Sequence, residues 1–476
     1  MVNNTILIGS IVFMFLVVSI GIWAGRQVKS SKSFFLAGGD QGMFPIIATQ
    51  AATAIGGGCM IGWVGFGYMF GWGVSWYGIC CIIGYFIVVQ SVGTFFQKKN
   101  FYTIPDWICY SLGEDKWVRG TSAILAIWLM ITAWSANAVA TGTIVNQLTG
   151  LPVKTGALVG GLLILAYCTI GGMQSVIKVD MVNFIILWLG IIILMPATIK
   201  MAGGFSAIVA ATPPENFNIW PGAVVGFAWL IALVPGMMTM QTVYQRFSAS
   251  KSVKVAKWGV YGTIISIIFI SIYASVTGMA LRVINPDIAP QLAVPWFASN
   301  QIHPILGIFI LGGILAALFS TSDSVLNSAS SNIAKDFYKG IFNQNANDKE
   351  MLKAGRIATV IIGILGIIIA LYVPSIMKLI IAGYSISAGG LLFPMFLAHF
   401  WKGTTKAGVL AGMMSGFVIV FPGTLIPSFG NWIKSILYNP TLAALLISLI
   451  LTVLISILTK TNKNAKILSE RNKVGN

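Results

Sequence analysis

Long apolar segments constrain this chain more than any other feature. A helix needs roughly 20 apolar residues to cross a bilayer core. Apolar runs of about this length lie at 5–24, 44–69, 74–96, 120–147, 155–172, 180–201, 222–243, 257–281, 304–331, 357–374, 377–399, 407–425 and 437–459. Only 9% of the 476 residues are charged, against about a quarter in soluble proteins. The pattern predicts an all-α integral membrane protein with about thirteen transmembrane helices. It excludes a soluble enzyme, a nucleic-acid-binding module and a disordered chain.

The positions of the basic residues predict the orientation of these helices. If the segments alternate from an outside N-terminus, 24 of the 29 Lys and Arg residues fall on the inner side. Five fall outside, namely Lys154, Lys200, Arg282, Lys378 and Lys434. Cytoplasmic loops of membrane proteins carry such an excess, so the net charge of +17 indicates orientation in the cell membrane. We expect an uncleaved first helix, because its basic residues follow the apolar run, whereas in a signal peptide they precede it.

Two of the predicted helices contain helix-breaking residues. Gly56, Gly57 and Gly58 interrupt the second segment, and Pro235 and Gly236 interrupt the seventh. Each break alone is consistent with a packing kink. Together they fall in the first helix of two successive groups of five that start on opposite sides of the membrane. This is the pattern of inverted repeats with a binding site at the midplane.

Polar residues at membrane depth predict a cation site. Asp180 and Asp323 are flanked by apolar sequence, and no Lys or Arg is expected at their depth, which favours a cation from solution. The alternatives are pairing of Asp180 with Lys178, and a structural carboxylate at Asp323. Five oxygen-bearing residues cluster around Asp323: Ser320, Thr321, Asp323, Ser324 and Asn327. Hard cations bind such oxygen ligands, although hydrogen bonding between helices would use the same groups.

Several motifs together resemble those of the sodium:solute symporter family, whose members share the five-plus-five inverted repeat of the LeuT fold. They are Ser33–Gly39, Ala52–Tyr68, Gly171–Val176 followed by Asp180, Tyr244–Ala249, and Ala316–Ser324 followed by Asp336–Tyr338. The resemblance runs from about Lys32 to Gly412. It implies an extra helix and loop at 1–33, a transport core at 34–400, two further helices at 401–459 and a basic cytoplasmic tail at 460–476.

The resemblance also implies site residues. The sodium site of the family corresponds to the carbonyls of Ala52, Ile55 and Ala317 and the hydroxyls of Ser320 and Thr321. A second sodium ion would lie at Asp180, Asp323 and Ser324. Helices 2, 4, 7 and 11 would bind the solute, with ordinary packing as the alternative for each residue: Gln50, Thr53, Ala54, Gly57, Trp134, Asn137, Met240, Gln241 and Tyr384.

One branch of the family, the choline transporters, shares further sequence with this chain. The likeness lies in Gly56–Gly58 and Gln344–Glu350. A quaternary ammonium requires an aromatic cage. Of the three cage positions expected in that branch, only Trp134 is aromatic here, and Ala54 and Met240 occupy the others. The resemblance therefore indicates the ion and the fold better than the solute.

We expect a Na⁺-coupled symporter that carries a small organic solute, such as an amino acid or organic acid, into the cell by alternating access. Its partners would be the solute, Na⁺ and the bilayer, with no nucleic acid and no obligate protein partner. Proton coupling through Asp180 or Asp323 is the main rival, followed by a sensor that binds solute without transport. An enzyme is not expected, because no nucleophile–His–acid set or metal cluster is seen among the five Cys and two His.

Overall fold

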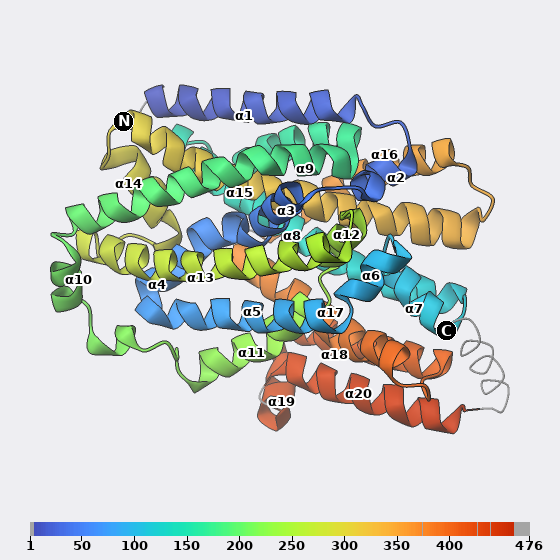
Figure 1. Ribbon diagram of the computed structural model, residues 1–476. Helices are drawn as coiled ribbons and strands as arrows, with labels where there is room; N and C mark the ends of the chain where they lie inside the picture. The colour runs from blue at the N-terminus through green and yellow to red at the C-terminus, as the bar shows by residue number, and fades with distance from the viewer. Residues whose placement is uncertain (1–3, 374, 426, 438, 461–476) are drawn as a thin grey trace.

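The computed structural model describes residues 4–373, 375–425, 427–437 and 439–460. These residues form a helical bundle that contains no β-strand (Figure 1). The long helices are α1 (Asn4–Gly25), α5 (Val74–Ser91), α8 (Lys116–Thr149), α9 (Val153–Met201), α11 (Ala223–Met238), α13 (Val253–Ile284), α15 (Pro304–Ser331), α16 (Asp348–Tyr372), α17 (Ile376–Phe400), α18 (Lys406–Leu425) and α20 (Pro440–Leu458). The predicted all-α membrane architecture is confirmed.

Shorter helices connect or complete the long ones. They are α2 (Ser31–Leu36), η1 (Ala37–Gly39), α3 (Met43–Gly57), η2 (Gly58–Trp63), α4 (Val64–Phe70), η3 (Gly71–Gly73), α6 (Gly93–Lys99), α7 (Ile104–Leu112), α10 (Phe205–Ala211), η4 (Pro214–Phe217), α12 (Gln241–Ala249), η5 (Pro290–Leu292), α14 (Ala293–Asn300), η6 (Asn332–Phe342) and α19 (Pro427–Leu437). Figure 1 shows α10 and α14 at one end of the bundle and α2, α6 and α7 at the other. We refer to the end with α10 and α14 as the α10 end. We refer to the end with α2, α6 and α7 as the α12 end.

Polar caps begin the helices that start at the α12 end. The Asp115 carboxylate accepts hydrogen bonds from the backbone N–H groups of Trp117 and Val118 at the start of α8. Ser252 caps α13 in the same way, and Asn347 with Glu350 forms a capping box at α16. Such side chains satisfy backbone donors that have no partner inside the helix. They fix where each apolar segment enters the membrane.

The number of membrane crossings differs from the predicted thirteen. Eleven helices in the described part of the chain are long and apolar enough to span a bilayer. Met60–Ser91 forms one candidate span, which joins the outer half of the second predicted helix to the third, while Met43–Gly56 is a shorter apolar helix. The fifth and sixth predicted helices are joined in α9. The count of thirteen therefore stays a prediction.

The backbone of α9 is interrupted where the two predicted helices meet. Its 49 residues would extend about 74 Å at 1.5 Å per residue, more than twice a bilayer core of roughly 30 Å. Gly172 is non-helical, with φ of 50° and ψ of −153°. A side chain is excluded there, because a Cβ atom would lie 2.4 Å from the Phe34 carbonyl oxygen. The sequence boundary at Gly172 is thus a real break within a continuous element.

The two predicted breaks near the midplane are also present, one of them displaced. Gly56 is non-helical within α3, with φ of 16° and ψ of 169°. The second break lies at Thr239 and Met240, between α11 and α12, and not at Pro235 and Gly236, which lie inside α11. Proline lacks an N–H but keeps its carbonyl. Thr239 uses that carbonyl, because both its N–H and its hydroxyl donate to Pro235 O, at 3.1 and 3.2 Å. The helix ends there.

The first and last long helices are consistent with an odd number of crossings. Figure 1 shows α1 beginning at the α10 end and α20 ending at the α12 end, on the opposite edge of the bundle. Helix α15 passes through the interior. Every residue from Ile310 to Ser331 is buried except Thr321, which is half-buried. The polar residues of α15 therefore face other helices, and Thr321 faces a cavity.

Candidate functional site

The broken helix α3 and the buried helix α15 meet through Thr321. Its hydroxyl donates to the Thr53 carbonyl oxygen at 3.0 Å and lies 3.2 Å from the Ala317 carbonyl oxygen. The contact is close, since a Cβ atom on Gly56 would lie 2.3 Å from Thr321 Oγ1. Glycine at the break therefore lets a hydroxyl of α15 reach the backbone oxygens of α3.

The five residues predicted to hold sodium lie on these two helices. Ala52, Ile55, Ala317 and Ser320 are fully buried, and Thr321 is half-buried. The side chain of Ser320 lies beside Asp180. Within the described residues, neither Ser320 Oγ nor Asp180 Oδ1 has a hydrogen-bond partner. Buried polar atoms are seldom left unpaired. An oxygen-binding cation beside Ser320 and Asp180 would satisfy both.

A buried arginine lies among the acidic residues, which corrects the expectation that no basic side chain reaches this depth. Arg246 is the sixth residue of α12, and its side chain is 1% exposed. Its Nη2 atom lies 3.9 Å from Asp180 Oδ2. The sequence argument had placed Arg246 in an inner loop, because it follows an apolar segment and precedes several basic residues. The structure turns it inward.

Both membrane acids are held by donors from neighbouring helices. Thr49 of α3 donates to Asp180 Oδ2 at 2.5 Å. Tyr167 of α9 donates to Asp323 Oδ2 at 3.1 Å, and Ser324 donates to Asp323 Oδ1 at 3.3 Å. The interfacial pairing of Asp180 with Lys178 is not formed, since Lys178 donates to Gln27. The second predicted ion group, Asp180, Asp323 and Ser324, is thus brought into one buried network with Arg246.

A cavity adjoins the break in α3. About 840 Å³ of space is free of protein atoms, its open mouth included. Among its described lining residues, none is charged. Its polar side chains include Thr53, Thr132, Asn137 and Thr321. A solute there would meet hydroxyl and amide groups in a largely apolar enclosure.

Five of the nine predicted solute-binding residues line this cavity. They are Thr53, Ala54, Asn137, Met240 and Tyr384. Trp134 and Gln241 are buried outside it: the Trp134 indole donates to Gly363 O at 2.9 Å, and Gln241 donates to Ser328 O at 2.9 Å. Gln50 is also buried and absent from the lining. The surroundings of Gly57 lie outside what the structure describes.

Aromatic side chains that the sequence reasoning missed form much of the cavity wall. Trp63 and Tyr77 have ring centroids 5.0 Å apart, and Phe66 packs on Tyr77 at 6.3 Å. Tyr85 also lines the cavity. Their spacing could have indicated this wall. Tyr77, Cys81 and Tyr85 follow one another every four residues and so lie on one face of a helix. The search for an aromatic cage had considered only three positions, taken from one branch of the family.

The α12 end of the bundle is closed below the cavity. Every residue of α12 is buried. Gln245 of α12 donates to Ser331 Oγ at 2.9 Å, and Gln241 donates to Asn332 Oδ1 at 2.6 Å. These contacts attach the inner half of the broken helix to the end of α15 and the start of η6. Buried polar contacts therefore hold this end of the bundle together.

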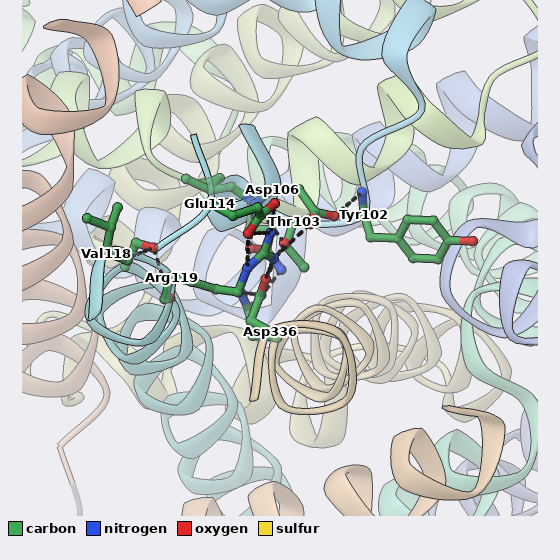
Figure 2. A network of polar contacts seen from close by, with 11 residues as sticks. Tyr102, Thr103, Asp106, Glu114, Val118, Arg119 and Asp336 are labelled. Atoms are coloured by element: carbon green, nitrogen blue, oxygen red, sulfur yellow. Dashed lines mark hydrogen bonds and ion pairs between the residues drawn. The ribbon is translucent and has the colours of Figure 1, made fainter. Parts of the chain in front are cut away.

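A second buried network strengthens the same closure (Figure 2). Arg119, near the start of α8, contacts Asp106 of α7 at 2.9 Å and Asp336 of η6 at 2.6 Å. It also contacts Glu114 at 2.8 Å. Asp336 accepts a further hydrogen bond from Asn332, which in turn donates to Gln241. Helices α7, α8, η6 and α12 are thus joined by charged and amide groups.

Two interrupted helices, buried oxygen atoms beside the break in α3 and an adjoining uncharged cavity are the features of an ion-coupled secondary transporter of the inverted-repeat class. The model of the sodium:solute symporter family matches residues 34–416, so the chain belongs to that family. The predicted extent, from about Lys32 to Gly412, agrees closely. The protein is accordingly a multi-pass membrane transporter that couples Na⁺ to a small solute, and it is not an enzyme.

Curated relatives and solved structures agree with this assignment. The chain is 27% identical over 454 residues to the high-affinity proline transporter PutP of Bacillus subtilis (strain 168), which covers 88% of this chain and 94% of that one. It is 25% identical over 494 residues to the sodium/proline symporter of Staphylococcus aureus (strain JH9), covering 97% and 94%. A Na⁺-coupled sialic acid symporter, solved with substrate in an outward-open state, has a TM-score of 0.80 at 18% identity, covering 95% and 97%. Mhp1, a nucleobase-cation-symport-1 family transporter, has a TM-score of 0.58 at 14% identity, covering 92% and 95%.

Proposed function

We propose that this protein imports a small zwitterionic amino acid together with Na⁺, and that proline is the first solute to test. The observation that carries the proposal is the uncharged cavity directly beside the ion-site oxygens of α3 and α15. A solute with a net charge would find no opposite charge in the described lining. The names of two similar proteins, both proline transporters, support the same choice.

The two broken helices offer complementary ends to a zwitterion. The carboxyl end of the α3 segment, at Gly56, presents carbonyl groups and the negative end of a helix dipole. The amino end of α12, after Met240, presents backbone N–H groups and the positive end. Both Gly56 and Met240 line the cavity. An ammonium group or Na⁺ would lie at the first end, and a carboxylate at the second.

Sodium would bind at Ala52, Ile55, Ala317, Ser320 and Thr321, bridging α3 and α15. This would fix the break of α3 and complete the solute cavity before the α12 end opens. With the N-terminus outside and the C-terminus in the cytoplasm, the cavity faces the exterior and the closed end faces the cytoplasm. One Na⁺ moving through the full potential contributes about 2.3 kcal/mol per 100 mV. That is roughly a fiftyfold concentration of a neutral or zwitterionic solute.

Uptake of radiolabelled L-proline into proteoliposomes tests the function. We expect uptake with an inward Na⁺ gradient and none with K⁺ in its place. Uptake in sodium-free buffer that follows a pH gradient would support the proton-coupled alternative. If proline is not taken up, a Na⁺-specific rise in melting temperature should be screened across amino acids, organic acids and quaternary amines, because ligands stabilise the form that binds them. Absence of any such rise would refute Na⁺ binding.

Asn137→Ala separates the solute site from the ion site. Asn137 lines the cavity and lies far along α8 from the described polar network of Arg119. The variant should need more solute for half-maximal uptake, while its Na⁺-dependent stabilisation stays unchanged. Asn146→Ala is the matched control, because Asn146 lies on the same helix and bonds to Leu151 O near the helix end. Equal behaviour of the two variants would contradict the solute site.

A further inference from the structure

The guanidinium of Arg246 occupies a position that a second metal ion would need. Its Nη2 atom lies 2.5 Å from Ser324 Oγ, 2.8 Å from Thr53 Oγ1 and 3.1 Å from Thr49 Oγ1. These oxygens come from α3 and α15, and Asp180 of α9 is 3.9 Å away. We propose that Arg246 is a built-in cation that takes the place of a second Na⁺, so that one Na⁺ moves with each solute. The inference rests on the Na⁺-coupled function proposed above.

In the second ion group, the oxygen atoms of Asp323 and Ser324 are already engaged. Ser324 Oγ accepts from Arg246, lies 2.8 Å from Thr53 Oγ1 and donates to Asp323 Oδ1. Asp323 Oδ2 accepts from Tyr167. A hard cation requires several oxygens whose lone pairs point at it. Here the lone pairs of Ser324 and Thr53 point at a guanidinium, and a second ion would have to displace it or lie against a like charge.

The first predicted sodium site, which includes Ser320, still has oxygen atoms that are not engaged in hydrogen bonds within the described part of the chain. Among the described residues, Asp180 Oδ1 and Ser320 Oγ are buried and lack hydrogen-bond partners. Both lie on the side of Asp180 that is not directed at Thr49, since Thr49 bonds to the other carboxylate oxygen. The unpaired oxygens of Asp180 and Ser320 thus offer ligands for one ion, next to the position predicted for the first sodium.

The charges of the network also indicate that one Na⁺ ion binds. With both carboxylates ionised, Asp180 and Asp323 carry two negative charges, and Arg246 supplies one positive charge. Buried charges in a membrane require compensation. One Na⁺ beside Asp180 and Ser320 brings the network to neutrality, whereas two would leave a net positive charge among buried groups. The two ionised carboxylates are therefore balanced by the arginine of α12 together with a single Na⁺.

The coupling ratio of the unmodified protein tests the proposal directly. Proteoliposomes would be held at equal Na⁺ on both sides with a tenfold solute gradient, and the potential would be set with K⁺ and valinomycin. Net flux should cease at about 59 mV for one Na⁺ per zwitterionic solute, and at about 30 mV for two. A value near 30 mV overturns the inference but leaves Na⁺ coupling standing. Absence of any Na⁺-driven flux would instead refute the proposed function.

Equilibrium binding of ²²Na⁺ to purified variants provides a second readout that does not depend on transport. The unmodified protein and Arg246→Lys, which keeps the positive charge, should bind one ion. Arg246→Gln removes the charge and frees the oxygens, so it should bind two, and the Hill coefficient should rise from about 1 to about 2. Arg282→Gln, in the last turn of α13, is the control and should bind one ion. Two ions bound to the unmodified protein would overturn the proposal whether or not any variant folds.

Discussion

Removal of the Ser320 hydroxyl should weaken Na⁺ binding without a comparable loss of folding stability. Ser320 Oγ is fully buried and forms no hydrogen bond of ordinary geometry among the described residues, so Ser320→Ala removes only its contact with Asp180. A hydrogen bond or ligand contact to a charged group is worth about 1.5–3 kcal/mol. At 1.4 kcal/mol per tenfold change, the half-saturating Na⁺ concentration should rise roughly tenfold to a hundredfold.

Thr321→Val provides a second test of the same site with shape retained. Thr321 Oγ1 contacts the carbonyl oxygens of Thr53 and Ala317, so valine removes the ligand and also the hydroxyl's hydrogen bond to the backbone of α3. Its effect on Na⁺ affinity should equal or exceed that of Ser320→Ala. Thr321→Ser keeps the hydroxyl and should restore most of the affinity.

The assay is a Na⁺ titration of the melting temperature, with choline as the replacement ion, followed by ²²Na⁺ binding. Ser322→Ala is the matched control. Ser322 is a buried serine of the same helix, but its hydroxyl donates to Leu318 O at 2.6 Å within the helix. It should leave Na⁺ affinity unchanged. If Ser320→Ala and Thr321→Val shift the titration no more than Ser322→Ala does, the ion assignment is wrong.

Three further predictions follow from other parts of the bundle. Gly67→Ala should destabilise the protein by about 1–3 kcal/mol, as overpacking does, because its Cβ atom would lie 2.0 Å from a backbone oxygen of α13; Gly62→Ala, with open space around it, should have little effect in the same thermal unfolding assay. Arg119→Gln leaves Asp336 buried without its cation, which should cost about 3–5 kcal/mol of stability. The variant should therefore favour opening of the α12 end, measured as faster labelling of an engineered cysteine in α12, and unchanged labelling would contradict this role. Burial raises the pKa of the Cys109 thiol to about 12, and nearby Arg119 opposes that rise only in part; because the thiolate is the reactive form, a protein with Cys109 as its single cysteine should resist maleimide at pH 7.4 and react once unfolded, and rapid native labelling would refute the burial.

The membrane fold could be read from the sequence because the bilayer imposes a simple rule. Apolar runs must be helical and long enough to cross, so the all-α class followed from hydropathy alone. The break at Gly56 could also be predicted from the sequence, because glycine within a helix is a helix-breaking residue. The second break was placed four residues early, because proline bends a helix at the point where its N–H is missing, while the end depends on the capping by Thr239.

The motif match predicted ion-site residues on two helices but not the groups that surround them. Ser320 and Thr321 were assigned to the ion site through the resemblance to the family. Five cavity residues were found in the same way, whereas Trp134 and Gln241 were assigned to the cavity and lie outside it. Spacing gives the face of a helix, but the neighbour of that face depends on how the helices cross. The aromatic wall at Trp63 and Tyr77 was missed for this reason.

The sequence by itself determined that the chain lies in a membrane, that two of its helices are interrupted, and that oxygen-bearing side chains lie deep within α15. These follow from transfer energies and backbone geometry, which act locally along the chain. Only the tertiary structure decided the place of Arg246. A basic residue after an apolar segment fits the positive-inside pattern whether it points to water or to the interior. Its inward position depends on acids and hydroxyls from α3, α9 and α15, which lie far apart in the sequence and meet only when the bundle is assembled.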